Sequence, residues 1–115
     1  MLALVCAVAL VGSIPWASAA TVAEIAKNPA AFDQKTVTVN GMAEEINSRT
    51  SRRGNSYTTF RLSDEGDAVK VFTFGTPPIK DGQRVEVRGV FQRVKHVGAY
   101  TFHDEIDASS VSAVR

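Results

Sequence analysis

The stretch QRVEVRGVFQRVK, residues 83–95, is the strongest indication of the fold, because it is predicted to form one long strand. Gly89 lies in its middle, where a glycine suits a β-bulge or a barrel corner. A long strand that bends at its centre is typical of small barrels, which need several further strands to close.

Four further strands accompany this stretch. Alternating apolar and polar residues predict strands over 35–46, 57–62, 68–74 and 99–111. Turn signals separate them, at Gly54-Asn55, at Asp64 to Asp67 and at Val97-Gly98. Five strands predict an all-β domain built as a small closed or nearly closed barrel, since a sandwich usually needs about seven.

A short helix is expected before the barrel. Thr21 and Glu24 have the spacing of a capping box, in which each side chain bonds to the backbone of the other residue. Asn28-Pro29 ends the helix. The predicted organisation is therefore a helix and connection over 20–34 and a barrel over 35–115.

The first nineteen residues contain no charged side chain and have the features of a leader. An apolar run from Leu2 to Val11 is followed by Ala17-Ser18-Ala19, the small-x-small pattern of a cleavage site. The run is too short to cross a hydrocarbon core of about 30 Å. We expect a signal peptide over 1–19 and a periplasmic or secreted protein. No Lys or Arg precedes the run, so an uncleaved membrane anchor is the alternative.

Composition and motifs limit the chemistry of the domain. The single cysteine, Cys6, lies in the expected leader, so the domain itself has no thiol. Thirteen basic and twelve acidic residues give a net charge of +1, which argues against a general polyanion binder but leaves room for a local basic patch. The chain has no glycine-rich phosphate loop, nucleophile elbow or activated cysteine. We expect a binding protein without cofactor and not an enzyme.

Five segments together carry a family resemblance: Val37-Thr-Val-Asn-Gly41, Tyr57-Thr-Thr-Phe-Arg-Leu-Ser-Asp64, Val69-Lys-Val-Phe72, Val85-Glu-Val-Arg-Gly-Val-Phe91 and Tyr100-Thr-Phe-His-Asp-Glu-Ile-Asp-Ala108. Over nearly the whole expected domain they resemble exported bacterial OB-fold proteins of the nucleic-acid-binding kind. The resemblance implies a five-stranded OB-fold barrel. It also suggests where a ligand would bind, although the fold does not fix the function.

The candidate site is the face of the second and third strands. OB barrels bind ligands there, between the loop joining strands one and two and the loop joining strands four and five. Cations in such loops hold phosphates, and exposed rings stack on bases. The expected ligand is an extended anion such as single-stranded nucleic acid, and the alternative ligand is an anionic glycan or peptide. The candidate residues are Arg49, Arg52, Arg53, Tyr57, Arg61, Arg93, Lys95 and His96. Phe60, Phe72 and Phe102 are expected in the core.

Two other interpretations stay open, and the first is haem or metal handling through His96, Tyr100 and His103. His96-Val-Gly-Ala-Tyr100 resembles the haem-attachment motif of the cytochrome c maturation haem chaperone, which implies His96 as the haem-bonding residue and Tyr100 as iron ligand. Strand alternation also places His103, Glu105 and Asp107 on one face, a candidate for metal handling, and turns Asp104 inward. The last interpretation is an envelope structural or stress protein with a protein partner.

Overall fold

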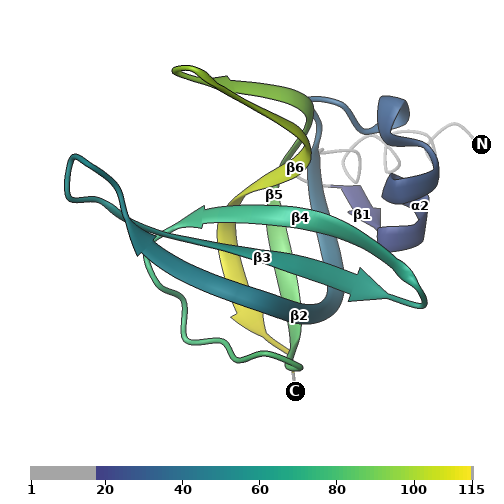
Figure 1. The fold of residues 1–115 in the computed structure, drawn as a ribbon. Coiled ribbons are helices and arrows are strands. Elements are labelled where there is room, and N and C mark those ends of the chain that lie inside the picture. The colour runs from purple at the N-terminus through teal and green to yellow at the C-terminus, as the bar shows by residue number, and fades with distance from the viewer. Residues whose placement is uncertain (1–17, 115) are drawn as a thin grey trace, which may run out of the picture.

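The computed structural model describes residues 18–114, and strands dominate it (Figure 1). The elements are β1 (Ser18–Ala20), α2 (Val22–Lys27), the 3-10 helix η1 (Pro29–Ala31), β2 (Thr36–Thr50), β3 (Ser56–Asp64), β4 (Asp67–Phe74), β5 (Arg84–Val97) and β6 (Tyr100–Ala113). The described part of the chain is thus mostly β, as the sequence predicts, with two short helices where one was expected. The expected leader lies outside the described residues except for Ser18 and Ala19.

The strands form one mixed sheet of order β1-β2-β3-β4-β6-β5, in which β2 also pairs with β5. The pairing that starts at β2 therefore returns to β2. This strand serves two neighbours because it is long: its first half, 36–42, pairs with β5 and its second half, 42–50, with β3. All these pairs are antiparallel except β1 with β2 and β4 with β6, which are parallel.

The core lies inside this ring of strands and is closed by α2. Alternation places Thr58, Phe60 and Leu62 inward on β3, as predicted. Val22 and Ile25 of α2 join the same apolar cluster. Each buried aliphatic side chain contributes about 1.5–3 kcal/mol by leaving water. The other buried apolar residues are Val37, Val39, Ala43, Val69, Val71, Val85, Val87, Phe91 and Ile106.

Gly89 makes the bend that the sequence predicts in β5. The register between β5 and β6 shifts between Arg88 and Gly89. A Cβ atom at position 89 would lie 2.2 Å from the backbone oxygen of Asp107 and 2.6 Å from the Cα of Ala108. β6 can approach β5 this closely only where β5 has no side chain, so glycine is required by packing rather than by its own backbone angles.

The N-terminal part of the described chain covers one end of the core. Thr21 Oγ1 accepts a hydrogen bond from the Glu24 amide at 3.1 Å, and Glu24 Oε1 accepts one from the Thr21 amide at 2.9 Å. The predicted capping box is therefore present. The sequence did not predict β1, which pairs with Val37 to Val39 of β2 and spans the expected cleavage point.

Two hairpins extend from the sheet and frame its β3–β4 face. In Figure 1 the hairpin joining β2 to β3 extends to the left, and the hairpin joining β5 to β6 extends across the top. Both are longer than predicted, because β2 continues to Thr50 and β5 to Val97. Within residues 18–114 no helix combines the length and apolar character needed to cross a membrane.

Candidate ligand-binding face

The candidate face is formed by the outward side chains of β3 and β4. Inward residues of β4 are Val69, Val71 and Thr73, so the alternate positions point outward. The antiparallel register then places outward residues of the two strands opposite each other: Tyr57 and Phe74, Thr59 and Phe72, and Arg61 and Lys70. The parallel pairing of β4 with β6 extends the same face to Glu105 and Asp107.

Five aromatic side chains lie on this side of the molecule in two groups, and we call them together the aromatic row: Tyr57, Phe72 and Phe74 on β3 and β4, and Tyr100 and Phe102 on β6. The ring centroids of Tyr57 and Phe72 are 5.5 Å apart, those of Phe72 and Phe74 are 5.1 Å apart, and those of Tyr100 and Phe102 are 6.4 Å apart. Phe74 is 74% exposed, Tyr100 69% and Phe102 38%. The row is therefore a solvent-accessible surface of flat rings.

The prediction that Phe72 and Phe102 belong to the core is wrong, and only Phe60 among the three is buried there. Phe72 has the same parity on β4 as Lys70 and Phe74, so it points outward. Phe102 points outward because Asp104 adopts a left-handed backbone with φ of 51°, which interrupts the alternation along β6. Asp104 is consequently exposed instead of inward-pointing.

Lys95 joins the two parts of the aromatic row. Its ammonium lies 4.1 Å from the ring centroid of Phe72 and 5.7 Å from that of Phe102. It also donates hydrogen bonds to Glu105 Oε1 at 2.9 Å and to Asp107 Oδ1 at 2.6 Å. We call Lys95, Glu105 and Asp107 the ion cluster. The ion cluster joins β5 to β6, and Lys95 also contacts β4 through the ring of Phe72.

The ion cluster determines the charge state of Lys95. Burial by itself lowers the pKa of the Lys95 ammonium. The hydrogen bonds and charges of Asp107 and Glu105 outweigh burial, and the pKa lies above its ordinary value of 10.5. Lys95 is thus a cation at neutral pH that two carboxylates already neutralise. It is a structural member of the face rather than the free cation that the sequence predicts.

The predicted arginines differ in how they are paired. Arg61 lies on the face, 3.7 Å from Glu44 Oε1 and 3.6 Å from Glu45 Oε2, so its charge is partly compensated. In the described part of the chain, no ion pair involves the arginines at the end of the β2–β3 hairpin. These are Arg49, Arg52 and Arg53, all exposed. The charge of these three arginines therefore lies beside the aromatic row, at Tyr57, which pairs with Arg49.

Two predicted site residues lie away from the aromatic row. His96 pairs across the hairpin with Thr101, whose Oγ1 is 3.2 Å from His96 Nδ1. Alternation places that pair on the side opposite Lys95 and Phe102. Arg93 is exposed, and its backbone amide donates a hydrogen bond to Asp33 Oδ1 at 3.0 Å. That bond ties this part of β5 to the connection before β2.

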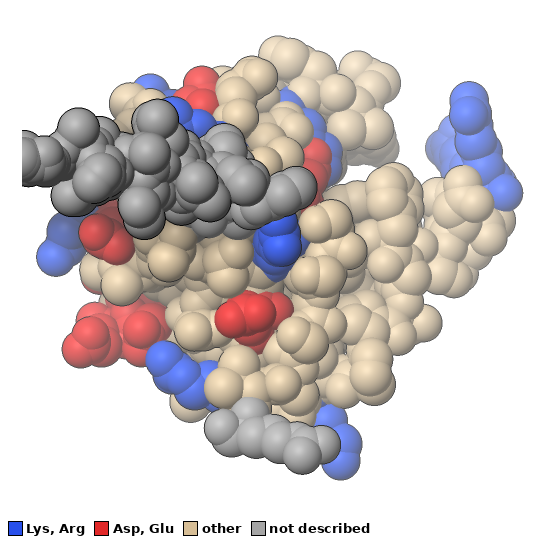
Figure 2. Space-filling model, turned by 180° about the vertical axis from the view of Figure 1, so that it is seen from behind, with Lys and Arg blue, Asp and Glu red and all other residues tan. Residues whose placement is uncertain are grey.

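A groove of about 320 Å³ crosses the face between β2, β3, β4 and β6. The charged and neutral polar groups that line it include Asn47, Thr59, Arg61 and Glu105, and the ring of Phe102 lies beside them. Because amide, hydroxyl and ionic groups lie beside a ring, the groove is suited to a flat ligand group with a polar edge. The opposite side of the molecule, shown in Figure 2, has basic and acidic side chains interspersed among large uncharged areas.

The residues of the haem and metal interpretations do not converge on one point. Tyr100 shares a side of the β5–β6 hairpin with Phe102, whereas His96 lies on the other side. His103 pairs with Val94 and faces away from Glu105 and Asp107, so the prediction that these three share a face is wrong. Among residues 18–114, no three His, Cys, Asp or Glu side chains gather as a metal site would need.

Comparison with known proteins gives a shared fold and no family. No protein-family model matches the sequence, and no curated protein matches it either. Among solved structures, the crystal structure of yeast Stn1 and Ten1 is similar with a TM-score of 0.67 at 11% identity, over 89% of this chain and 65% of that one. A Leishmania major protein assigned as an aspartyl-tRNA synthetase is similar with a TM-score of 0.61 at 15% identity, over 88% of this chain and 22% of that one. This chain thus spans less than two thirds of either structure, and it has a fold of the OB type.

Proposed function

We propose that this chain is an exported, non-enzymatic OB-fold binding module whose closed five-stranded barrel binds an extended anionic ligand with planar rings. Single-stranded nucleic acid is the ligand that fits this description best. The apolar leader supports a periplasmic or secreted location, and the resemblance to exported bacterial OB-fold proteins agrees with it. The main support for this proposal is the aromatic row on the β3–β4 face.

The arrangement of rings and charges supports this ligand class. Bases stack on exposed aromatic side chains, and each stacked base contributes about 1–3 kcal/mol. Phosphates need cations that are not already neutralised. Among the described residues, the arginines of the β2–β3 hairpin and Lys70 on the face itself form no ion pair. The ligand would therefore place rings along the aromatic row and phosphates toward Arg49, Arg52 and Arg53.

A salt-dependent titration tests the arginines. We expect the purified protein to bind a labelled oligodeoxythymidine, with affinity that falls as salt rises because bound counterions are released. Arg52→Ala/Arg53→Ala should weaken binding and reduce the slope of log affinity against log salt by about 1.4, since each lost contact to a single strand removes about 0.7. Fluorescence anisotropy at several salt concentrations measures both quantities.

The matched control removes the same charge from another wall of the barrel. Arg84 and Arg88 are exposed on β5, whose residues there pair with β2 and β6. Arg84→Ala/Arg88→Ala changes the net charge equally and should leave the salt slope nearly unchanged. If both double variants lose the same affinity, binding depends on the net charge of the protein and not on the position of the arginines. Absence of any binding at low salt would instead reject nucleic acid and favour a protein partner.

A further inference from the structure

The β5–β6 hairpin ends in two exposed rings, Tyr100 and Phe102, which stand two residues apart on the same side of β6. Their ring centroids are 6.4 Å apart, and their planes are inclined to each other by 30°. Alternate side chains of a strand leave the backbone about 6.6 Å apart, so the two rings keep the spacing of the strand and do not lean together. Stacked flat rings lie about 3.4 Å apart, as bases do in DNA. The pair is therefore spaced almost as two rings are when a third flat ring lies between them.

The other ring pairs of the aromatic row are closed. The rings of Tyr57 and Phe72 are inclined by 24° with centroids 5.5 Å apart, and Phe74 meets Phe72 edge-on, at 86° and 5.1 Å. Both distances are too short for a flat group between the rings, so a base can stack only on the outer side of this group. Within residues 18–114, the rings of Tyr100 and Phe102 are therefore the pair that has room for a base between them.

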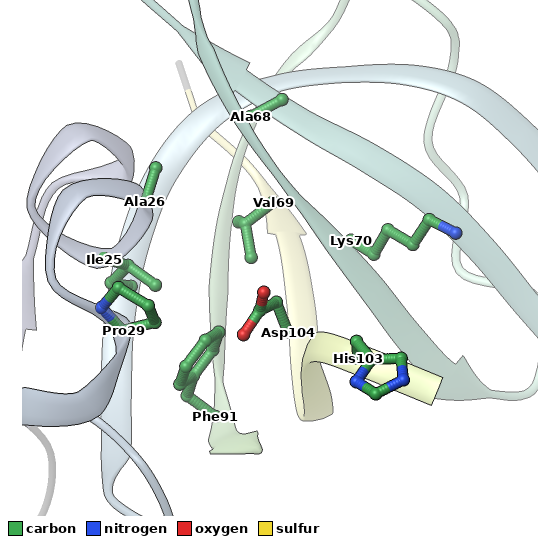
Figure 3. Close-up of a pocket in the computed structure, with 9 residues that line it drawn as sticks. All are labelled: Ile25, Ala26, Pro29, Ala68, Val69, Lys70, Phe91, His103 and Asp104. Carbon is green, nitrogen blue, oxygen red and sulfur yellow. The ribbon is translucent and has the colours of Figure 1, made fainter. Parts of the chain in front are cut away.

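Phe102 is held in position by its neighbours on β5 and β6. Its ring centroid lies 5.7 Å from the Lys95 ammonium, which the ion cluster keeps in place through hydrogen bonds of 2.9 and 2.6 Å. The left-handed backbone at Asp104 turns Phe102 to that side, and Figure 3 shows β6 bending sharply there, at His103 and Asp104. A ring held in this way loses little freedom when a ligand stacks on it. Tyr100 is 69% exposed, so the other side of the gap is open to solvent.

We propose that Tyr100 and Phe102, which we call the ring clamp, take one purine base of a single strand between their rings, an inference that rests on the nucleic-acid function proposed above. A base in the ring clamp stacks on both of its faces, whereas a base on Tyr57, Phe72 or Phe74 stacks on one. A purine has two fused rings and covers more of both clamp rings than a pyrimidine does. One-sided stacking accepts every base, because every base has a flat face. The ring clamp therefore gives the strand a preference for a purine at one position.

Two strands of about ten nucleotides test the ring clamp by fluorescence anisotropy. One is oligodeoxythymidine, and the other has a single adenine at its centre. Because a thymidine tract can shift along the protein, the adenine can reach the ring clamp. We expect the purified protein to bind the adenine-containing strand about fivefold more tightly, as one better-stacked base would give. With the fluorescent purine 2-aminopurine in place of the adenine, binding should quench most of the fluorescence, because the base then stacks between two rings.

The ratio of the two affinities separates the ring clamp from the rest of the aromatic row. Tyr100→Leu keeps an apolar side chain but removes one flat ring, so the ratio should fall to about one, whereas Tyr100→Phe should keep it. The control Phe74→Leu removes an exposed ring outside the ring clamp and should weaken both strands equally. Equal affinity of the wild-type protein for the two strands, or an unchanged ratio in Tyr100→Leu, would overturn the ring clamp and leave nucleic-acid binding in place. Failure of both strands to bind would overturn the proposed function together with the ring clamp.

Discussion

Replacing Gly89 with alanine is expected to lower the free energy of unfolding by about 3 kcal/mol or more. The new Cβ would lie 2.2 Å from the Asp107 oxygen, and backbone atoms cannot move aside as the end of a side chain can. β5 and β6 would have to separate where they pass beside Phe91 and Ile106 of the core. Urea denaturation followed by circular dichroism measures the change.

Gly98→Ala is the matched control for this prediction. Gly98 has a φ of 60° in the β5–β6 turn, and a Cβ there meets nothing within 4 Å. The control therefore carries only the cost of a left-handed alanine, about 1–2 kcal/mol. If Gly89→Ala lowers the free energy of unfolding no more than Gly98→Ala does, β5 and β6 do not approach each other as closely at Gly89 as the structure shows.

Replacing Lys95 with methionine is expected to cost about 3–5 kcal/mol, the usual result of removing one partner from a buried ion pair. The loss of the partner would destabilise the charge of Glu105 more than that of Asp107, because the Glu105 side chain is only 6% exposed, compared with 32% for Asp107. The loss comes mainly from the buried carboxylate left without a partner. The double variant Lys95→Met/Glu105→Met should therefore recover a large part of the stability. A single variant within 1 kcal/mol of wild type would show that the ion cluster is not a buried unit.

The stability difference between wild type and Lys95→Met should also depend on pH, in a direction that the pKa of Lys95 determines. Because the folded-state pKa of Lys95 is raised above 10.5, the contribution of its charge is fully present below 10.5. It is lost as the pH rises through the raised folded-state value. The stability difference between wild type and Lys95→Met should therefore shrink in alkaline solution. A difference that stays constant from well below to well above 10.5 would contradict this assignment.

Much of the fold could be predicted because alternation is a local signal. Thr58, Phe60 and Leu62 lie inside as their spacing indicates, and the bend at Gly89 follows from a glycine within a long strand. The ring of pairings could not be predicted in detail, because it depends on contacts between strands far apart in the sequence. β1 was missed since three small residues carry no strand pattern.

The candidate site was harder to predict than the fold. The sequence did contain a signal for Phe72, because Lys70, Phe72 and Phe74 share one parity on β4 while Val69 and Val71 share the other. Phe102 could not be placed by alternation, since the left-handed backbone of Asp104 changes the side on which it lies. The neutralisation of Lys95 depends on Glu105 and Asp107 in the opposite strand, and no local pattern shows such pairing.

Substitutions in the aromatic row show by one affinity measurement whether the row binds the ligand. Phe74 and Tyr100 are its most exposed members, so Phe74→Ala/Tyr100→Ala should leave the fold intact. Anisotropy titration with an oligodeoxythymidine of about ten nucleotides should show affinity reduced at least about thirtyfold, as expected when two stacked bases are lost. Val94→Ala, on the opposite side of the β5–β6 hairpin, should bind like wild type. Wild-type affinity in the double aromatic variant would show that the aromatic row does not bind the ligand.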